Sequence, residues 1–157
     1  MRLIAPIGGI RSTRSPRQGA AMVEFAVISI PLFLVLFGIF EYGRYVFILQ
    51  MMENAAREGA RFAVVNTFSP TVAADTQTRV RRFLSGVDVN AFGSQATINV
   101  FAADIAGNNL GSAQNAAFGT YICVQVVGDF RPITPNLFFS GSSFRMDIRA
   151  LMNSEAN

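Results

Sequence analysis

Residues 20–40 read AAMVEFAVISIPLFLVLFGIF and carry a single charged side chain, that of Glu24. As an α-helix this stretch would span roughly 31 Å, which matches the hydrocarbon core of a bilayer. A lone segment in lipid must satisfy its backbone polar groups internally, so a helix is the expected structure. Pro31 predicts a kink of a kind that membrane helices tolerate. The stretch therefore predicts one transmembrane helix, with the lipid bilayer as its surroundings.

The charges around this stretch predict its orientation. The first nineteen residues hold no acidic residue and four arginines, Arg2, Arg11, Arg14 and Arg17. The positive-inside rule places that end in the cytoplasm and residues 66–157 outside the cytoplasmic (inner) membrane. Tyr42 and Tyr45 follow the stretch, where an interfacial aromatic belt would lie. No small-residue cleavage site of the conventional secretory kind follows, so the segment is expected to stay as an anchor.

Composition excludes several function classes. Apolar residues make up 51% of the 157 residues and charged residues 15%, against about 25% charged in an ordinary soluble domain. The basic cluster precedes the apolar stretch instead of forming a face of a domain, which argues against nucleic acid as a partner. With no His and a single Cys, the usual zinc ligands and the His-activated nucleophiles are missing. We expect no catalytic residues, no metal and no cofactor, and a buried, inert Cys123.

Glu24 is the residue that suggests a mechanism. A carboxylate within a bilayer is costly, although the cost falls toward the headgroups. If the chain were cut after Gly19, Ala20 would carry a new cationic amine, roughly 6 Å along the helix axis from Glu24. The amine of a neighbouring subunit could then pair with Glu24, which would favour association and fix the axial register. The alternative is a charge at the cytoplasmic edge of the span that reaches the headgroups.

The segment around Gly19 resembles the processing site of type IV prepilins. Arg17-Gln18-Gly19 precedes Ala20, and Glu24 would be the fifth mature residue, followed by Phe25 as in the Flp/Tad pilus branch. Two later stretches, GIFEYGR at 38–44 and NAAREGAR at 54–61, resemble the TadE-like family of minor pseudopilins. The resemblance covers about residues 17–65, with a weaker echo at 130–135 and in the last strand.

The resemblance implies a function and partners. It implies cleavage between Gly19 and Ala20 by a prepilin peptidase, and assembly through Glu24 and Phe25. Further implied partners are other pilins or pseudopilins of the Tad pilus and its inner-membrane assembly platform. The family also implies a role in pilus biogenesis and cell adhesion, with residence in the inner membrane or the pilus.

Beyond the membrane the same helix is predicted to continue, over residues 20–65, because no strong breaker interrupts it. Ala55, Gly59 and Ala63 repeat every four residues, and such small-residue stripes let another backbone approach closely. The stripe could pack on the protein's own sheet or on a partner subunit. Two ion pairs are predicted on the helix surface, Glu53 with Arg57 and Glu58 with Arg61.

Residues 66–157 predict a small α+β domain. Ser69-Pro70 is predicted to open a helix that ends at Gly86, with Arg79, Arg81 and Arg82 on a solvated face and a phosphate or headgroup site as the weaker alternative. Strands are predicted at 96–103, 119–130 and 143–152, and a loop at 106–119. The last strand alternates, with an inward set and an outward set of side chains. The inward set is Phe144, Met146, Ile148 and Ala150, and the outward set is Arg145, Asp147 and Arg149. The scattered aspartates are interpreted as solvated, and GNNLG at 107–111 as a turn.

These observations predict an α+β, pilin-like fold. It would comprise a basic cytoplasmic leader (1–19), a long helix (20–65) whose outer half packs on a small antiparallel sheet, and an extracytoplasmic domain (66–157). The predicted function is that of a minor pilin or pseudopilin supporting assembly of a Tad-type (type IVb) pilus. The alternatives are a minor pseudopilin of a type II secretion system and an unprocessed single-pass protein with an outer binding domain. A membrane-anchored enzyme is a further alternative for which no residue set can be named.

Overall fold

The computed structural model describes residues 16–86, 96–133 and 143–154, with the side chains of 16–18 left aside. Helix α1 spans Pro16–Val65 and includes Pro31. Contacts divide the chain into two units, residues 1–39 and residues 40–157, so the division falls within α1. The predicted long helix is confirmed and ends at Val65 as expected, but it begins at Pro16, four residues before Ala20.

In the second unit, the part of α1 from Phe40 onward supplies one side of the hydrophobic core. Ile48, Met52, Ala55, Ala56 and Ala60 recur at helical spacing and are all buried. Apolar residues at this spacing form one stripe along a helix, and burial of the stripe stabilises it more than intrinsic helix propensity does.

Helix α2 spans Val72–Leu84 and buries Val72, Thr76, Val80 and Leu84. The prediction that Ser69-Pro70 opens this helix was wrong by two residues, because α2 begins at Val72. The Ser69 hydroxyl accepts a hydrogen bond from the Thr71 backbone N–H at 3.3 Å, and the Ser69 carbonyl accepts one from the Val72 N–H at 3.2 Å. Ser69 therefore builds the turn that leads into α2, and Thr71 is the residue at the N-cap position.

Four strands form one antiparallel sheet in the order β2-β1-β3-β4. Their bounds are Thr97–Ala103 for β1, Asn109–Ser112 for β2, Tyr121–Phe130 for β3 and Phe144–Asn153 for β4. The predicted strands β1, β3 and β4 are confirmed, but the expected inward position of Phe144 on β4 was wrong, because this first residue of the strand is exposed. The inner face of the sheet contributes Ile98, Val124, Val126, Met146 and Ala150 to the same core as the helices.

The predicted loop at 106–119 contains a strand, β2, so that prediction was wrong. Asp104 reverses the chain after β1: its carboxylate accepts hydrogen bonds from the Asn108 backbone N–H at 2.8 Å and from the Asn108 side-chain amide at 2.7 Å. The chain then returns along β1, with Ala102 opposite Gly111. All four residues of β2 are exposed, so the apolar alternation that would reveal a half-buried strand is absent.

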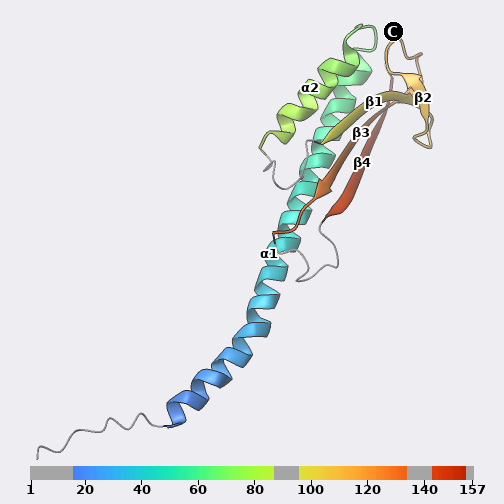
Figure 1. Ribbon diagram of the computed structural model, residues 1–157. Coiled ribbons are helices and arrows are strands. Elements are labelled where there is room, and N and C mark those ends of the chain that lie inside the picture. The colour runs from blue at the N-terminus through green and yellow to red at the C-terminus, as the bar shows by residue number, and fades with distance from the viewer. Residues whose placement is uncertain (1–15, 87–95, 134–142, 155–157) are drawn as a thin grey trace, which may run out of the picture. The chain divides into compact units, whose positions relative to one another are not determined.

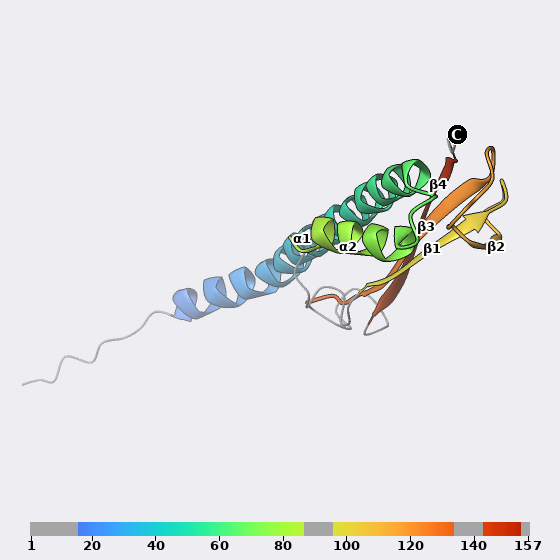
Figure 2. The ribbon, with the colours of Figure 1, turned by 90° about the horizontal axis from the view of Figure 1, so that it is seen from above.

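Within the second unit, α1 and α2 lie side by side and cover one face of the sheet (Figure 1). The view from above shows the two helices on the same side, with β2 at the sheet edge (Figure 2). The predicted α+β class, with a long apolar helix and a small antiparallel sheet, is confirmed.

Candidate functional site

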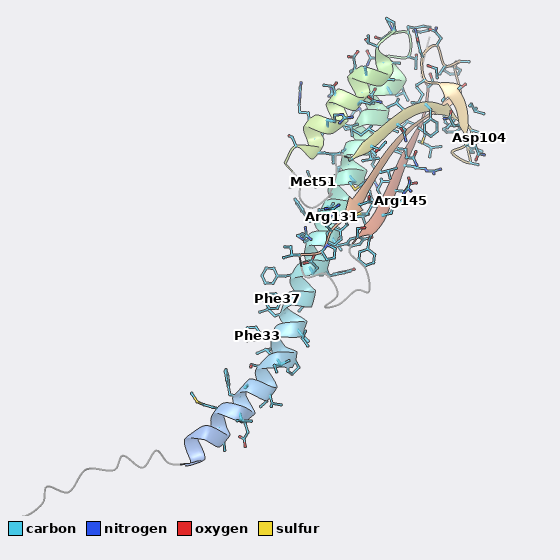
Figure 3. The ribbon with its side chains drawn as sticks, viewed as in Figure 1. Phe33, Phe37, Met51, Asp104, Arg131 and Arg145 are labelled. Atoms are coloured by element: carbon cyan, nitrogen blue, oxygen red, sulfur yellow. The ribbon has the colours of Figure 1, made fainter. Side chains whose placement is uncertain are left out.

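The first unit offers apolar side chains that nothing in the described chain covers. Every described side chain from Gly19 to Ile39 is exposed or partly exposed. Phe33 and Phe37, labelled in Figure 3, lie one helical turn apart with ring centroids 6.4 Å from each other. This helix is long and apolar enough to cross a membrane. Its length and exposure are compatible with a single-pass membrane protein.

The predicted processing and assembly residues lie on this helix. Gly19, Ala20, Glu24 and Phe25 all belong to α1 and are exposed, and no atom lies within 4 Å of the place where a Cβ on Gly19 would stand. Among the described side chains, none forms an ion pair with Glu24. Arg2, Arg11 and Arg14 lie outside the described residues. The Gly19–Ala20 bond therefore lies within the first turns of α1, in surroundings open to another protein.

The small-residue stripe lies in the second unit, where the chain's own domain covers it. Ala55, Gly59 and Ala63 are all buried. A Cβ placed on Gly59 would stand 2.5 Å from Val80 Cγ2 and 3.3 Å from Val124 Cγ1. Glycine at position 59 thus permits the close approach of α1 to α2 and β3.

A buried carboxylate joins α1 to the segment that follows β3. Glu41 is 5% exposed, and its Oε1 accepts hydrogen bonds from Arg44 Nη2 at 2.6 Å and from the Ile133 backbone N–H at 3.0 Å. Arg44 Nη2 also donates to the Arg131 carbonyl oxygen. We call Glu41, Arg44 and the segment 131–133 the domain-entry cluster. Hydrogen bonds to charged groups are stronger than neutral ones, and burial makes the loss of one partner costly.

Aromatic packing completes the domain-entry cluster. The Arg44 guanidinium carbon lies 4.5 Å from the centre of the Phe130 ring, and Phe130 is fully buried. Tyr45 packs edge-on against the same ring, with its ring centroid 5.3 Å from that of Phe130. Tyr45 therefore packs within the domain, whereas Tyr42 is exposed and remains available for the predicted interfacial belt.

The surface ion pairs of α1 differ in part from the prediction. Glu53 and Arg57 pair at 3.1 Å, as predicted. Glu58, however, pairs with Arg79 of α2 at 2.8 Å, and not with Arg61 among the described residues. Arg79 also lies over the Phe62 ring, 5.2 Å from its centre. This pair links the two helices, which a one-turn rule applied to a single helix could not reveal.

In the part of the chain that the structure describes, the acidic side chains and Cys123 do not gather into a metal site. Among the described residues, no three acidic, His or Cys side chains lie close enough together to hold a metal ion. Asp88 lies outside those residues. Cys123 is fully buried on β3, and burial raises the pKa of its thiol. A buried thiol with a raised pKa is a poor nucleophile.

The described residues define a class: an N-terminal helix long and apolar enough to span a membrane, followed by a small α+β domain. The family model described as TadE-like protein matches residues 19–61. The resemblance to the TadE-like family is thereby confirmed over this segment, which indicates a protein associated with the Tad pilus. No curated protein and no solved structure gives a significant match to the chain.

The family match begins at Gly19 and includes Glu24, Glu41 and Arg44. In the sequence, residues 38–44 and 130–135 stood out only as two separate stretches that resemble the family. The structure shows that the described part of the second stretch is hydrogen-bonded to the first. The sequence signal that could have indicated this cluster is the pair Glu41 and Arg44, an acidic and a basic residue three positions apart directly after the apolar stretch.

Proposed function

We propose that this protein is a minor pilin or pseudopilin that supports assembly of a Tad-type pilus. The observation that carries the proposal is the TadE-like match over residues 19–61, which begins at the predicted cleavage site and covers the exposed apolar helix. In this account a prepilin peptidase cuts after Gly19, and the mature helix stays in the inner membrane with the domain outside. The role is structural, and other Tad pilins and the assembly platform are the partners.

The exposed surface of the anchor supports assembly through helix packing. Glu24 is one turn from Ala20, so after cleavage its carboxylate would lie at nearly the depth of the new amine of a neighbour. A lone carboxylate costs about 3 kcal/mol at the centre of a membrane helix on insertion scales and less near its ends, so the cost at Glu24, the fifth residue of the span, is below that figure. Pairing with the neighbouring amine would reduce that cost only in the assembled state, and so would favour assembly.

The proposal is tested by replacing Glu24 in cells that lack the unaltered copy. Glu24→Leu makes the span more apolar and should leave membrane insertion and processing intact, while pilus number falls to the level of the deletion strain. Glu24→Asp keeps the charge and should retain part of the function. Val23→Leu, a change at the neighbouring exposed position, is the matched control. Normal piliation with Glu24→Leu would contradict the assembly role of this residue.

The main alternatives differ in what they require. A type II secretion pseudopilin would also be processed, but its loss would abolish protein secretion and spare the pilus. An unprocessed single-pass binding protein would keep its first nineteen residues. Secretion assays and piliation counts on one deletion strain distinguish the first alternative, and the N-terminus of the protein distinguishes the second.

A further inference from the structure

The end of the domain where α1 enters it presents an exposed surface of mixed character. Tyr42 and Ile133 are 66% and 73% exposed, and Arg131 is exposed beside them in the chain. The domain-entry cluster holds Arg131 and Ile133 against the turn of α1 that also carries Tyr42, because Glu41 binds the Ile133 N–H and Arg44 binds the Arg131 carbonyl. In Figure 3, Arg131 lies beside α1 at this end of the domain, and Asp104 lies at the opposite end.

The depth of this surface follows from the helix that carries it. The apolar stretch ends at Phe40, and Arg44 lies roughly 6 Å further along the axis of α1. The headgroup layer extends about 5–7 Å beyond the hydrocarbon core on each side of a bilayer. When the anchor lies in a bilayer, the residues bound to Glu41 and Arg44 therefore lie at the level of the headgroups.

Among the described residues at this end of the domain, Arg131 is a cation that no ion pair neutralises. Glu41 and Arg44 neutralise each other at 2.6 Å. Arg145 of β4 lies opposite Asp129 in the register of β3 and β4. Within the part of the chain that the structure describes, the Arg131 guanidinium has no ion-pair partner. A guanidinium binds phosphate oxygens through bidentate hydrogen bonds. Tyrosine is enriched at the headgroup level of a bilayer.

We propose that Tyr42, Arg131 and Ile133 form a membrane-binding surface, in which Arg131 binds the phosphate of an anionic phospholipid and Ile133 and Tyr42 lie at the boundary between headgroups and acyl chains. The domain would then rest on the membrane in a fixed orientation before it meets other subunits. This inference rests on the anchor lying in a bilayer, which the proposed function also requires.

The absence of tryptophan from the chain gives a direct test. A single Trp is introduced into the full chain at Ile133, at Ile105 or at Ile30. The protein is placed in phosphatidylcholine nanodiscs that contain lipid brominated near the top of its acyl chains or, for the Ile30 variant, near their methyl ends, because Ile30 is midway along the apolar stretch. Ile105 is 82% exposed and follows Asp104 at the opposite end of the domain. Fluorescence of Ile133→Trp and Ile30→Trp should be quenched, and that of Ile105→Trp should not.

The assignment of a lipid phosphate to Arg131 is tested by using brominated acyl chains on lipids of one headgroup class at a time. At equal fractions of brominated lipid, phosphatidylglycerol should quench Ile133→Trp more than phosphatidylcholine does, with a local enrichment of up to about fivefold for one arginine at the surface. Adding Arg131→Gln should remove this excess and leave quenching by phosphatidylcholine. Arg61→Gln, roughly 26 Å further along α1 than Arg44, is the matched control and should leave the excess unchanged.

Each other outcome overturns a stated part of the inference. If Ile30→Trp is quenched and Ile133→Trp is not, the membrane-binding surface is wrong while the anchor and the proposed function stand. If Ile30→Trp is also unquenched, the anchor is not in the bilayer and both fail. If the two lipids quench equally, or if Arg61→Gln acts like Arg131→Gln, the assignment of phosphate to Arg131 is wrong. Circular dichroism of every variant confirms that it is folded.

Discussion

The Glu41 carboxylate accepts a hydrogen bond from the backbone N–H of Ile133 at 3.0 Å, across 92 positions of the chain. This bond ties the strand side of the domain to the first turn of α1 after the apolar stretch. The Arg44 side chain strengthens the link, because it donates both to Glu41 and to the Arg131 carbonyl. The domain-entry cluster therefore fastens the segment that follows β3 to the part of α1 directly after the apolar stretch.

Replacing Glu41 should destabilise the domain. Glu41→Ala leaves the Ile133 N–H without its acceptor and removes the counterion of the partly buried Arg44, which keeps only the Arg131 carbonyl. The change should cost about 2–3 kcal/mol of unfolding free energy. Glu41→Gln retains an oxygen acceptor and should cost about half as much. The measurements are unfolding in detergent micelles and amide hydrogen exchange of the peptide that contains residues 131–133.

The matched control for this change is Glu53→Ala. Glu53 pairs with Arg57 on the exposed surface of the same helix, and such i,i+4 pairs contribute only about 0.3–0.5 kcal/mol. Equal losses from Glu41→Ala and Glu53→Ala, or unchanged exchange at residues 131–133, would show that the cluster does not hold the domain together.

Gly59 should not tolerate even a methyl group. A Cβ at this position would stand 2.5 Å from Val80 Cγ2, and such overpacking costs about 1–3 kcal/mol. Alanine also favours the helix by about 1 kcal/mol relative to glycine, so the net effect of Gly59→Ala should be a loss of up to about 2 kcal/mol of unfolding free energy. Thermal unfolding in micelles measures the change.

Gly43 provides the comparison for that prediction. It lies on the same helix, and no atom lies within 4 Å of the place where its Cβ would stand. Gly43→Ala should therefore show only the propensity gain, and its melting temperature should rise or stay unchanged. If both variants gain stability alike, the close approach of α2 to α1 at Gly59 is not as tight as described.

Burial of the Cys123 thiol predicts how the free energy of unfolding changes at alkaline pH. Burial raises the pKa of Cys123 above its ordinary value of 9.0, so the folded protein holds the thiol proton more tightly than the unfolded chain does. Stability from this group is fully present below about pH 9 and is lost as the pH rises through the folded pKa. Cys123→Ala removes this dependence.

Denaturant unfolding of the wild type and of Cys123→Ala at about pH 7 and about pH 10, on either side of the ordinary thiol pKa, measures the effect. The difference in unfolding free energy between the two proteins should shift in favour of the variant at the higher pH. The native thiol should also resist maleimide at neutral pH until denaturant is added. Rapid labelling of the folded protein would contradict the burial of Cys123.

The parts of the fold that rest on local patterns could be predicted from the sequence. The apolar stretch at 20–40 has bilayer length, and β4 alternates between buried Met146 and Ala150 and less buried Arg149, so both elements were predictable. Strand β2 was not, because all its residues are exposed and its pairing depends on the turn that Asp104 and Asn108 build. Tertiary pairing there overrides a loop-like composition.

The candidate site was also predicted only in part from the sequence. Gly19, Ala20, Glu24 and Phe25 were predicted because their spacing within a few residues resembles a known processing site. The partners of Glu41 and Glu58 were not predicted, because Ile133 and Arg79 come from other parts of the chain. Spacing along one helix identifies neighbours within a turn, whereas these contacts exist only after the chain has folded.

The central claim is that the chain is processed as a prepilin. The measurement that tests it most directly is the N-terminal sequence and intact mass of the protein isolated from native membranes, with and without the prepilin peptidase. The account predicts an N-terminus at Ala20 that depends on the peptidase, with nineteen residues lost. An intact leader beginning at Met1, or trimming at another position without the peptidase, would contradict it.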